Sequence, residues 1–262
     1  MAQVFPRSAN TLSTVSLIAA GLFTVGLVAG GMAITRSGYN TKAGTPLEQP
    51  VPFSHEHHAT ELGIDCRYCH STVEKSSFAG IPPTHTCMSC HSQIWTNSPL
   101  LEPVRESYRT GTPIKSTDGP IGWTRVNKLP EFVYFNHSIH ISRGVSCNVC
   151  HGPIQKQQIT YKDKPFFMKW CVDCHRNPEG FLGEPKDIFE LYVNAQRGYA
   201  FDETIVNGEK KLEKRDLTPD ERGLLYNPGY EPSAERIERG KKYIEKYKIH
   251  KEQLTDCWIC HR

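Results

Sequence analysis

The ten cysteines of this chain fall into five pairs, each with the spacing C-x-x-C and each followed directly by a histidine. The two cysteines of such a pair can attach a porphyrin covalently, and the adjoining histidine then becomes the proximal ligand of its iron. This is the attachment sequence of c-type haem. The expected covalent positions are Cys66, Cys69, Cys87, Cys90, Cys147, Cys150, Cys171, Cys174, Cys257 and Cys260. The expected proximal ligands are His70, His91, His151, His175 and His261.

Other chemistries use the same cysteine spacing. A lone C-x-x-C is often a zinc knuckle or a redox dithiol, and ten cysteines in an exported chain could form disulfides. None of these explains a histidine at the same place five times with no cysteine left over. We therefore predict five c-type haems as the cofactors.

The composition fits a cofactor-filled interior. Of the 262 residues, 38% are apolar, and part of this share lies in one N-terminal block. The remainder is poor in core-forming side chains, although 10% aromatic and 23% charged residues do not suggest disorder. We expect a multihaem c-type cytochrome, with mainly short α-helices and loops wrapped around five haems and one N-terminal transmembrane helix. A net charge of +3 without a Lys/Arg-rich run gives no reason to expect nucleic acid.

The pattern F-x-H-x-x-H occurs twice, at residues 53–58 and 135–140, and two C-x-x-C-H sequences follow each copy. Duplication of a two-haem module is the simple explanation. Histidines at i and i+3 of a helix share one face, so each could ligate a different iron. Together with one methionine, they give as many distal ligands as there are haems. The predicted distal ligands are His55, His58, His137, His140 and Met168.

Three histidines remain outside this ligand set, and we expect them to be solvated or bonded to haem propionates: His57, His85 and His250. His85 and His250 are the alternatives to Met168. With the predicted set, four haems are bis-histidine and one is His/Met, and methionine ligation raises the reduction potential. No iron keeps an open position, so we predict no catalytic residue and an electron-transfer protein that is not an enzyme by itself.

The segment from Ser16 to Thr35 is almost entirely apolar. About 20 residues span a bilayer, whereas the apolar region of a signal peptide is about 7–15 residues long. The segment also lacks a clear small-residue cleavage site, so we expect a retained, single-pass anchor. The flanking charges leave its orientation open. Since bacteria attach c-type haem outside the cytoplasm, we expect the haem domain on the periplasmic side of the inner membrane.

The expected organisation follows from these motifs. We assign an anchor helix to residues 1–35 and a linker to 36–52. Two two-haem modules follow, at 53–95 and 131–180, with a connecting segment at 96–130. Residues 181–262 form a charged helical region that ends in the fifth haem sequence. Within the last region we expect a helix over Pro185–Gln196, a second that begins after Thr218 and a third capped by Ser233.

The chain resembles the pentahaem cytochrome c subunit of bacterial alternative complex III. The resemblance rests on the single N-terminal membrane helix and on sequence blocks that contain the haem motifs. These blocks are FSHEHHATELGIDCRYCHSTVEKSSFAGIPPTHTCMSCHSQIW, FNHSIH with CNVCH, MKWCVDCHR and LTDCWICHR. The resemblance is weakest over residues 176–256.

The resemblance implies a wire for electrons in a membrane-bound quinol:acceptor oxidoreductase. The implied partners are an iron–sulfur subunit, polysulfide-reductase-type membrane subunits that oxidise quinol, and a monohaem cytochrome c subunit. The implied acceptor is a soluble cytochrome, a copper protein or a terminal oxidase. A self-sufficient, membrane-anchored multihaem quinol dehydrogenase is the alternative, and a catalytic multihaem reductase is a third class. Both of these would need an open or weakly held iron position.

Overall fold

The computed structural model describes residues 4–114, 122–206, 209–226 and 229–262. It divides into two compact units, Met1–Thr45 and Pro46–Arg262. The division lies inside the segment that the sequence predicted to be a linker. Each unit is described by itself.

The first unit consists of α1 (Ala9–Arg36) and the short α2 (Gly38–Thr41). Helix α1 has 28 residues, no acidic residue in its first turn and no buried residue. Among the described residues it gives the one candidate span that is long and apolar enough to cross a membrane. The structure therefore confirms a continuous N-terminal apolar helix, which contains the whole predicted segment from Ser16 to Thr35.

Short helices hold the haem-attachment sequences of the second unit. Each C-x-x-C pair lies within a helix, which places its two cysteines on one face. The helices are α3 (Cys66–Cys69), α4 (Thr84–His91), α7 (Cys147–His151), α8 (Met168–Arg176) and α12 (Cys257–Cys260). The F-x-H-x-x-H segments form a π-helical turn, η1 (Glu56–Glu61), and the helix α6 (His137–Ile141).

The connecting segment contains a helix that the sequence did not predict. Helix α5 (Glu102–Thr110) follows the 3₁₀ turn η2 (Pro99–Leu101) and packs against α4. Its buried Val104 joins Val51 and Ile114 in a small apolar cluster. The residues Gly111-Thr112-Pro113 predict a turn, and Gly111 ends the helix there with φ 69°. A second predicted turn, Asp118-Gly119-Pro120, lies outside the described residues.

The charged C-terminal region contains the three predicted helices. They are α9 (Pro185–Arg197), α10 (Pro219–Tyr226) and α11 (Ala234–Lys246). Ser233 caps α11 by accepting a hydrogen bond from the Arg236 amide. Thr218 caps α10 by accepting from the Glu221 amide. The 3₁₀ turns η3 (Ile154–Lys156), η4 (Pro178–Gly180) and η5 (Lys251–Gln253) complete the described helical elements.

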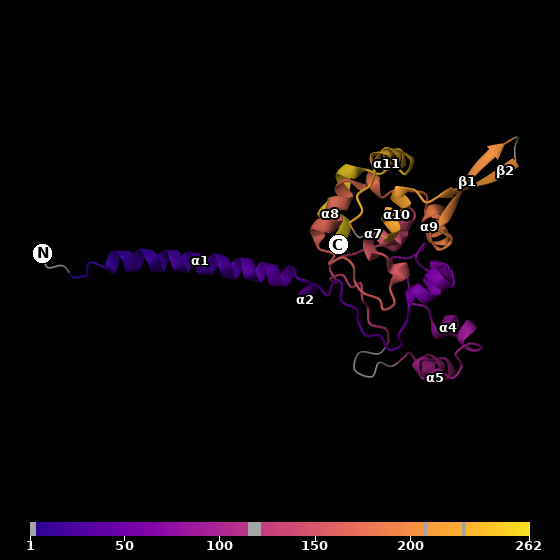
Figure 1. Cartoon of the computed structure of the whole chain (residues 1–262), viewed down its shortest axis with the longest axis horizontal. Helices are drawn as coiled ribbons and strands as arrows, with labels where there is room; N and C mark the ends of the chain where they lie inside the picture. The colour runs from indigo at the N-terminus through magenta and orange to yellow at the C-terminus, as the bar shows by residue number, and fades with distance from the viewer. Residues whose placement is uncertain (1–3, 115–121, 207–208, 227–228) are drawn as a thin grey trace. The chain divides into compact units, whose positions relative to one another are not determined.

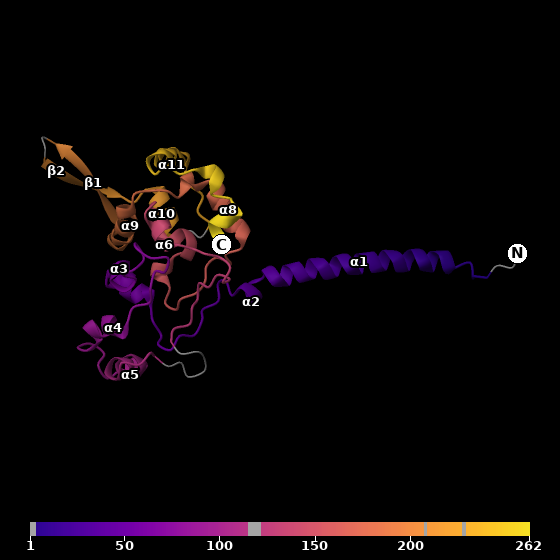
Figure 2. The ribbon, with the colours of Figure 1, turned by 180° about the vertical axis from the view of Figure 1, so that it is seen from behind.

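A β-hairpin was not expected in this region. Strands β1 (Tyr199–Val206) and β2 (Glu209–Asp216) pair antiparallel, with Tyr199 opposite Asp216, and the hairpin projects from the rest of the unit in both ribbon views (Figures 1 and 2). A sequence signal for the hairpin was present, because residues 199–206 include several β-branched and aromatic residues and are followed by Asn207-Gly208, a dipeptide typical of two-residue hairpin turns. The helical patterns on either side led to a prediction of helices only.

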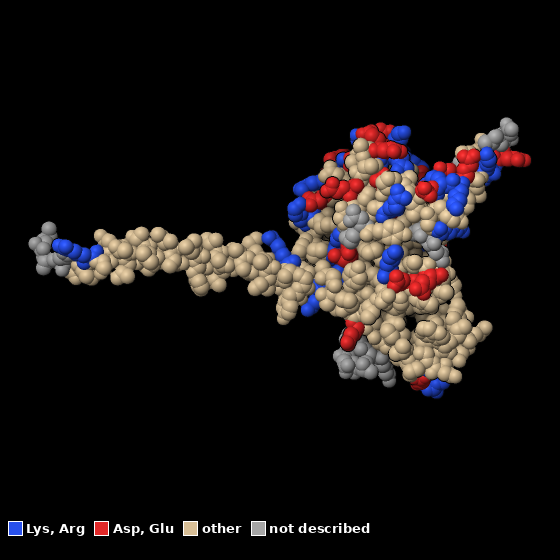
Figure 3. Space-filling view, viewed as in Figure 1, with Lys and Arg blue, Asp and Glu red and all other residues tan. Residues whose placement is uncertain are grey.

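The protein core is small for a chain of this length. The larger cluster comes mainly from α9, β1 and α10, and the cysteines Cys66 and Cys147 pack against it. Large apolar side chains elsewhere in the haem modules stay exposed, including Phe78, Ile81 and Trp95. Figure 3 shows a mostly uncharged surface around α4 and α5, whereas charged side chains gather around α11 and the hairpin. These exposed apolar groups are what a large apolar cofactor would cover.

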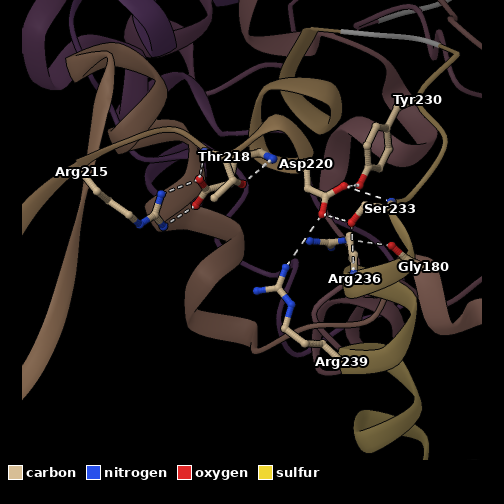
Figure 4. A network of polar contacts seen from close by, with 9 residues as sticks. Gly180, Arg215, Thr218, Asp220, Tyr230, Ser233, Arg236 and Arg239 are labelled. Atoms are coloured by element: carbon tan, nitrogen blue, oxygen red, sulfur yellow. Dashed lines mark hydrogen bonds and ion pairs between the residues drawn. The ribbon is translucent and has the colours of Figure 1, made fainter.

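A polar network ties α10 to α11 and η4 (Figure 4). The Asp220 carboxylate accepts hydrogen bonds from the Ser233 hydroxyl at 2.6 Å and from the Tyr230 hydroxyl. Arg236 donates from Nε to the Gly180 carbonyl oxygen at 2.7 Å. The network joins α10 to α11 and fixes α11 to η4, which follows the C-x-x-C-H sequence at 171–175.

Candidate haem-binding sites

We number the C-x-x-C-H sequences 1 to 5 in chain order: site 1 (66–70), site 2 (87–91), site 3 (147–151), site 4 (171–175) and site 5 (257–261). At four of them, a predicted distal histidine faces the proximal histidine. The ring centres are 6.5 Å apart for His55–His70, 6.2 Å for His58–His91, 6.4 Å for His137–His151 and 6.2 Å for His140–His175.

These separations fit an iron held between two imidazoles. Such an iron needs roughly 6 Å between ring centres, because each metal–nitrogen bond is about 2 Å long and each ring centre lies about 1 Å beyond its nitrogen. Direct ring stacking would bring the centres closer. The four pairs therefore fit c-type haem. In each pair, the histidine of the C-x-x-C-H sequence would bind one face of the haem iron and the histidine of the F-x-H-x-x-H pattern the other.

Hydrogen bonds orient most of these rings through Nδ1. His70 Nδ1 lies 2.7 Å from the Gly80 carbonyl oxygen, and His58 Nδ1 lies 2.8 Å from that of Ser54. Backbone carbonyls are partners of the same kind for His91, His137, His140, His175 and His261. An Nδ1–H that donates to a carbonyl leaves the Nε2 lone pair free for a metal.

Burial keeps two of the paired histidines neutral. Desolvation, with repulsion from neighbouring histidines, lowers the pKa of His55 to about 4 and the pKa of His151 to about 4. A neutral imidazole is the form that ligates a metal. The protein therefore prepares these rings for ligation near neutral pH.

The phenylalanine of each F-x-H-x-x-H pattern supports both distal rings. Phe53 stacks on His58 at 4.5 Å and meets His55 edge-on at 5.0 Å. Phe135 makes the same two contacts, at 4.6 Å with His140 and 4.8 Å with His137. The matching geometry shows why the aromatic residue is repeated, which the sequence pattern alone did not explain.

Site 5 differs from the other four. The ring of His261 faces Phe132 at 5.8 Å, and its Nδ1 lies 3.0 Å from the Phe132 carbonyl oxygen. Met168 is the first residue of α8 and is 70% exposed. It lies three residues before Cys171 of site 4, and Cys171 lies near Cys260 of site 5.

The three other histidines have different surroundings. His57 Nδ1 pairs with the Glu61 carboxylate at 2.7 Å. The ring of His85 meets Tyr108 edge-on at 4.7 Å. His250 Nδ1 lies 3.5 Å from Glu252. Each of the three therefore contacts a side chain that is not a proximal histidine.

Contacts between the sites place them in a row. A cysteine of site 1 lies near the cysteines of site 2 and another near site 3, and cysteines of sites 3 and 4 and of sites 4 and 5 are likewise neighbours. Tyr68 of site 1 also hydrogen-bonds Ser89 of site 2 at 2.6 Å. His175 Nδ1 of site 4 lies 2.8 Å from the carbonyl oxygen of Leu254, just before site 5. The spatial order is therefore 2–1–3–4–5, which the chain order does not reveal.

Comparison with known proteins agrees with this cofactor chemistry. The family model for cytochrome c7 and related cytochrome c matches residues 133–198, which contain sites 3 and 4. The menaquinone reductase multihaem cytochrome c subunit of Nitratidesulfovibrio vulgaris is 31% identical over 180 residues, which cover 61% of this chain and 80% of that protein. The chain therefore belongs to the family of multihaem c-type cytochromes that includes this subunit, and it is an electron-transfer component rather than an enzyme by itself.

Proposed function

We propose that the chain is the periplasm-facing electron wire of a membrane-bound quinol:acceptor oxidoreductase complex, with five c-type haems. The observation that carries the proposal is the set of four histidine pairs with ring centres 6.2–6.5 Å apart. A bound haem supplies an iron that alternates between the ferrous and ferric states and so carries one electron.

The chain's own residues would close the iron positions from both sides. The four ring pairs account for the proximal histidines of sites 1 to 4. His261 remains, and we assign Met168 as its distal ligand because the four other distal candidates are already paired. Met168 also lies three residues before Cys171 on α8, and Cys171 lies near Cys260 of site 5. Saturated positions leave no place for a substrate and favour transfer over chemical conversion.

The row gives the wire two ends, site 2 and site 5. His55 and His58 link sites 1 and 2, and His137 and His140 link sites 3 and 4, since each pair lies on one short helical segment. Each F-x-H-x-x-H segment therefore fixes two neighbouring sites against each other. We propose that electrons enter at one end and leave at the other.

The finer assignment is the pentahaem subunit of alternative complex III. Its supports are the N-terminal apolar helix, the five C-x-x-C-H sequences and the membership of a family that includes a subunit of a quinone-linked complex. In that assignment α1 anchors the chain in the bacterial inner membrane. The partners are an iron–sulfur subunit, polysulfide-reductase-type membrane subunits and a monohaem cytochrome c, and electrons pass to a soluble or membrane acceptor.

A second candidate function is electron transfer in the opposite direction, from a soluble donor to quinone. The relative is named for menaquinone reduction, so a wire of this family can serve a complex that delivers electrons to quinone. Mixing the isolated complex with quinol, and separately with reduced soluble cytochrome, would show which donor reduces the haems. Reduction by quinol alone supports the first direction, and reduction by the soluble donor followed by quinol formation supports the second.

Two measurements test the wire itself. Mass spectrometry of the full chain should find five covalently bound haems, and fewer would contradict the proposal. The purified chain alone should be reduced by quinol far more slowly than the intact complex. Equal rates would favour the self-sufficient quinol dehydrogenase instead.

A further inference from the structure

Sites 1 and 3 form the junction between the two duplicated modules. Cys66 and Cys147 lie near each other across it, and both pack against the same buried cluster. His137 Nδ1, on the second module, lies 2.8 Å from the carbonyl oxygen of Ser77, which follows site 1. In the row 2–1–3–4–5, an electron that moves from one module to the other must cross here.

The C-terminal region supplies the core beneath this junction. Ile188 and Tyr192 of α9 and Leu225 of α10 belong to one buried cluster, and Cys66 and Cys147 both pack against it. A segment distant in sequence from both sites therefore contacts the first cysteine of each. This gives α9 and α10 a place in the wire that their charged sequence did not suggest.

Tyr192 contacts site 3 through its hydroxyl. The side chain is buried, with 9% of its surface exposed. Its hydroxyl donates a hydrogen bond to Asn148 Oδ1, lies 3.5 Å from Ser146 Oγ and is close to the Cys147 sulfur. Asn148 is the second residue of the site 3 motif, so the tyrosine is hydrogen-bonded to the helical turn that carries the two cysteines.

Asn148 is itself held firmly. Its Nδ2 donates to Gln155 Oε1 at 3.0 Å and to the Leu225 carbonyl oxygen at 3.0 Å. Gln155 Nε2 donates to the same carbonyl at 3.0 Å. All of these groups are buried, so a changed partner would leave a polar atom without a hydrogen bond.

The same tyrosine also borders site 1. Together with Cys66 and Phe189 it lines a small cavity beside that site. The ring also belongs to the buried cluster against which both Cys66 and Cys147 pack. One buried side chain therefore lies beside the attachment cysteines of both sites at the junction.

We propose that Tyr192 is a positioning residue for electron transfer, which fixes the separation and orientation of sites 1 and 3. The inference rests on the proposed function, because it assumes that both sites hold haem. Transfer between two redox centres depends steeply on their separation, so a side chain that fixes the junction controls coupling along the whole row. The buried hydroxyl makes this contact specific, since an apolar ring of the same shape would fill the space without holding Asn148.

The test uses the full-length, haem-loaded protein with Tyr192→Phe. Closely spaced haems couple their main absorption bands, which gives a two-signed circular dichroism signal that depends on their separation and orientation. We expect Tyr192→Phe to keep its haem content and absorption spectrum, to weaken the two-signed signal and to shift the midpoint potentials of two haems. Tyr199→Phe is the matched control, because Tyr199 packs on Phe201 in the hairpin, and it should leave both measurements unchanged.

Unchanged dichroism and potentials in Tyr192→Phe would overturn the inference, even if the variant were less stable. Gln155→Ala loosens Asn148 from its other side-chain partner and should change both measurements in the same way. If the Tyr192→Phe protein cannot be purified, the same two measurements on Gln155→Ala test the inference.

Fewer than five haems in the unmodified chain would contradict the proposed function. Unchanged dichroism and potentials of Tyr192→Phe in a chain with five haems would contradict only this inference.

Discussion

The imidazole planes of His58 and His91 cross at 62°, whereas the other three histidine pairs lie within 23° of parallel. His58 and His140 each bond the carbonyl four residues before them and stack on a phenylalanine, so these contacts do not distinguish the two pairs. The proximal rings differ: His91 Nδ1 lies 3.3 Å from the nearby Ile94 carbonyl oxygen, whereas His175 Nδ1 lies 2.8 Å from that of the distant Leu254. Hydrogen-bond partners of a metal-ligating histidine fix its ring orientation. Site 2, at one end of the row, is thus set apart from its neighbours by geometry.

Electron paramagnetic resonance of the oxidised protein should show this difference. Parallel imidazole planes split the iron d orbitals strongly and give a rhombic low-spin signal, whereas steeply crossed planes leave them nearly degenerate and give a signal with one large g value. We expect one haem of the second kind and assign it to site 2. Rhombic signals from every haem, with no signal of the second kind, would contradict this assignment.

Replacing one distal histidine should open one iron. His58→Ala removes the ring that faces His91, and we expect a high-spin haem at site 2 that binds carbon monoxide when reduced. The neighbouring His57→Ala is the control, because His57 pairs with Glu61 and should leave every haem low-spin. A low-spin His58→Ala protein, or a high-spin His57→Ala protein, would contradict the assigned pairing. Optical spectra with and without carbon monoxide measure both.

Replacing Met168 should lower one reduction potential. Methionine ligation raises the potential relative to histidine, within the roughly 0.8 V range over which axial ligands set haem potentials. We expect Met168→His to shift the haem with the highest potential to a lower value in a spectroelectrochemical titration. Met88→Leu is the matched control, since Met88 lies inside its own C-x-x-C-H loop. An unchanged titration in Met168→His would assign the fifth distal position to another residue, with His85 and His250 as the candidates.

The C-terminal helices should lose stability in acid. Burial opposes ionisation of Glu221, but hydrogen bonds from Arg215 and Thr218 outweigh it and lower the pKa of this carboxyl from its ordinary value of 4.5. A carboxyl whose pKa is lower in the folded state stabilises the fold. This stabilisation is complete when the pH is above the pKa of the unfolded state, and it is lost as the pH falls through the pKa of the folded state. We expect Glu221→Gln to destabilise the protein at neutral pH by about 1.5–3 kcal/mol and to remove part of the acid sensitivity.

Denaturant unfolding, followed by far-ultraviolet circular dichroism at several pH values, measures this effect. Glu213→Gln is a suitable control, because Glu213 is exposed and forms an exposed ion pair with Lys211. An equal decrease in the free energy of unfolding in both variants would mean that general surface charge, rather than the Arg215 contact, sets the pH dependence of stability.

The local chemistry of the haem sites follows directly from the sequence. A C-x-x-C-H motif places its cysteines and histidine within one helical turn, so residues 66–70 and the four equivalent segments could be recognised without any tertiary information. The helices after Thr218 and Ser233 were also readable, because a capping side chain acts within three residues. The hairpin β1–β2 was missed because its charged strands lie between helical patterns that dominated the interpretation.

Only the tertiary structure could reveal how these local units meet. Nothing within the motifs states that the Cys66 sulfur lies near Cys147, that His261 faces Phe132, or that Tyr192 reaches Asn148, because each contact joins residues far apart in the chain. The spatial order of the sites depends on how α9 and α10 pack beneath the junction. Sequence spacing thus determines which residues can bind haem, whereas long-range packing decides which sites are neighbours along the path of the electrons.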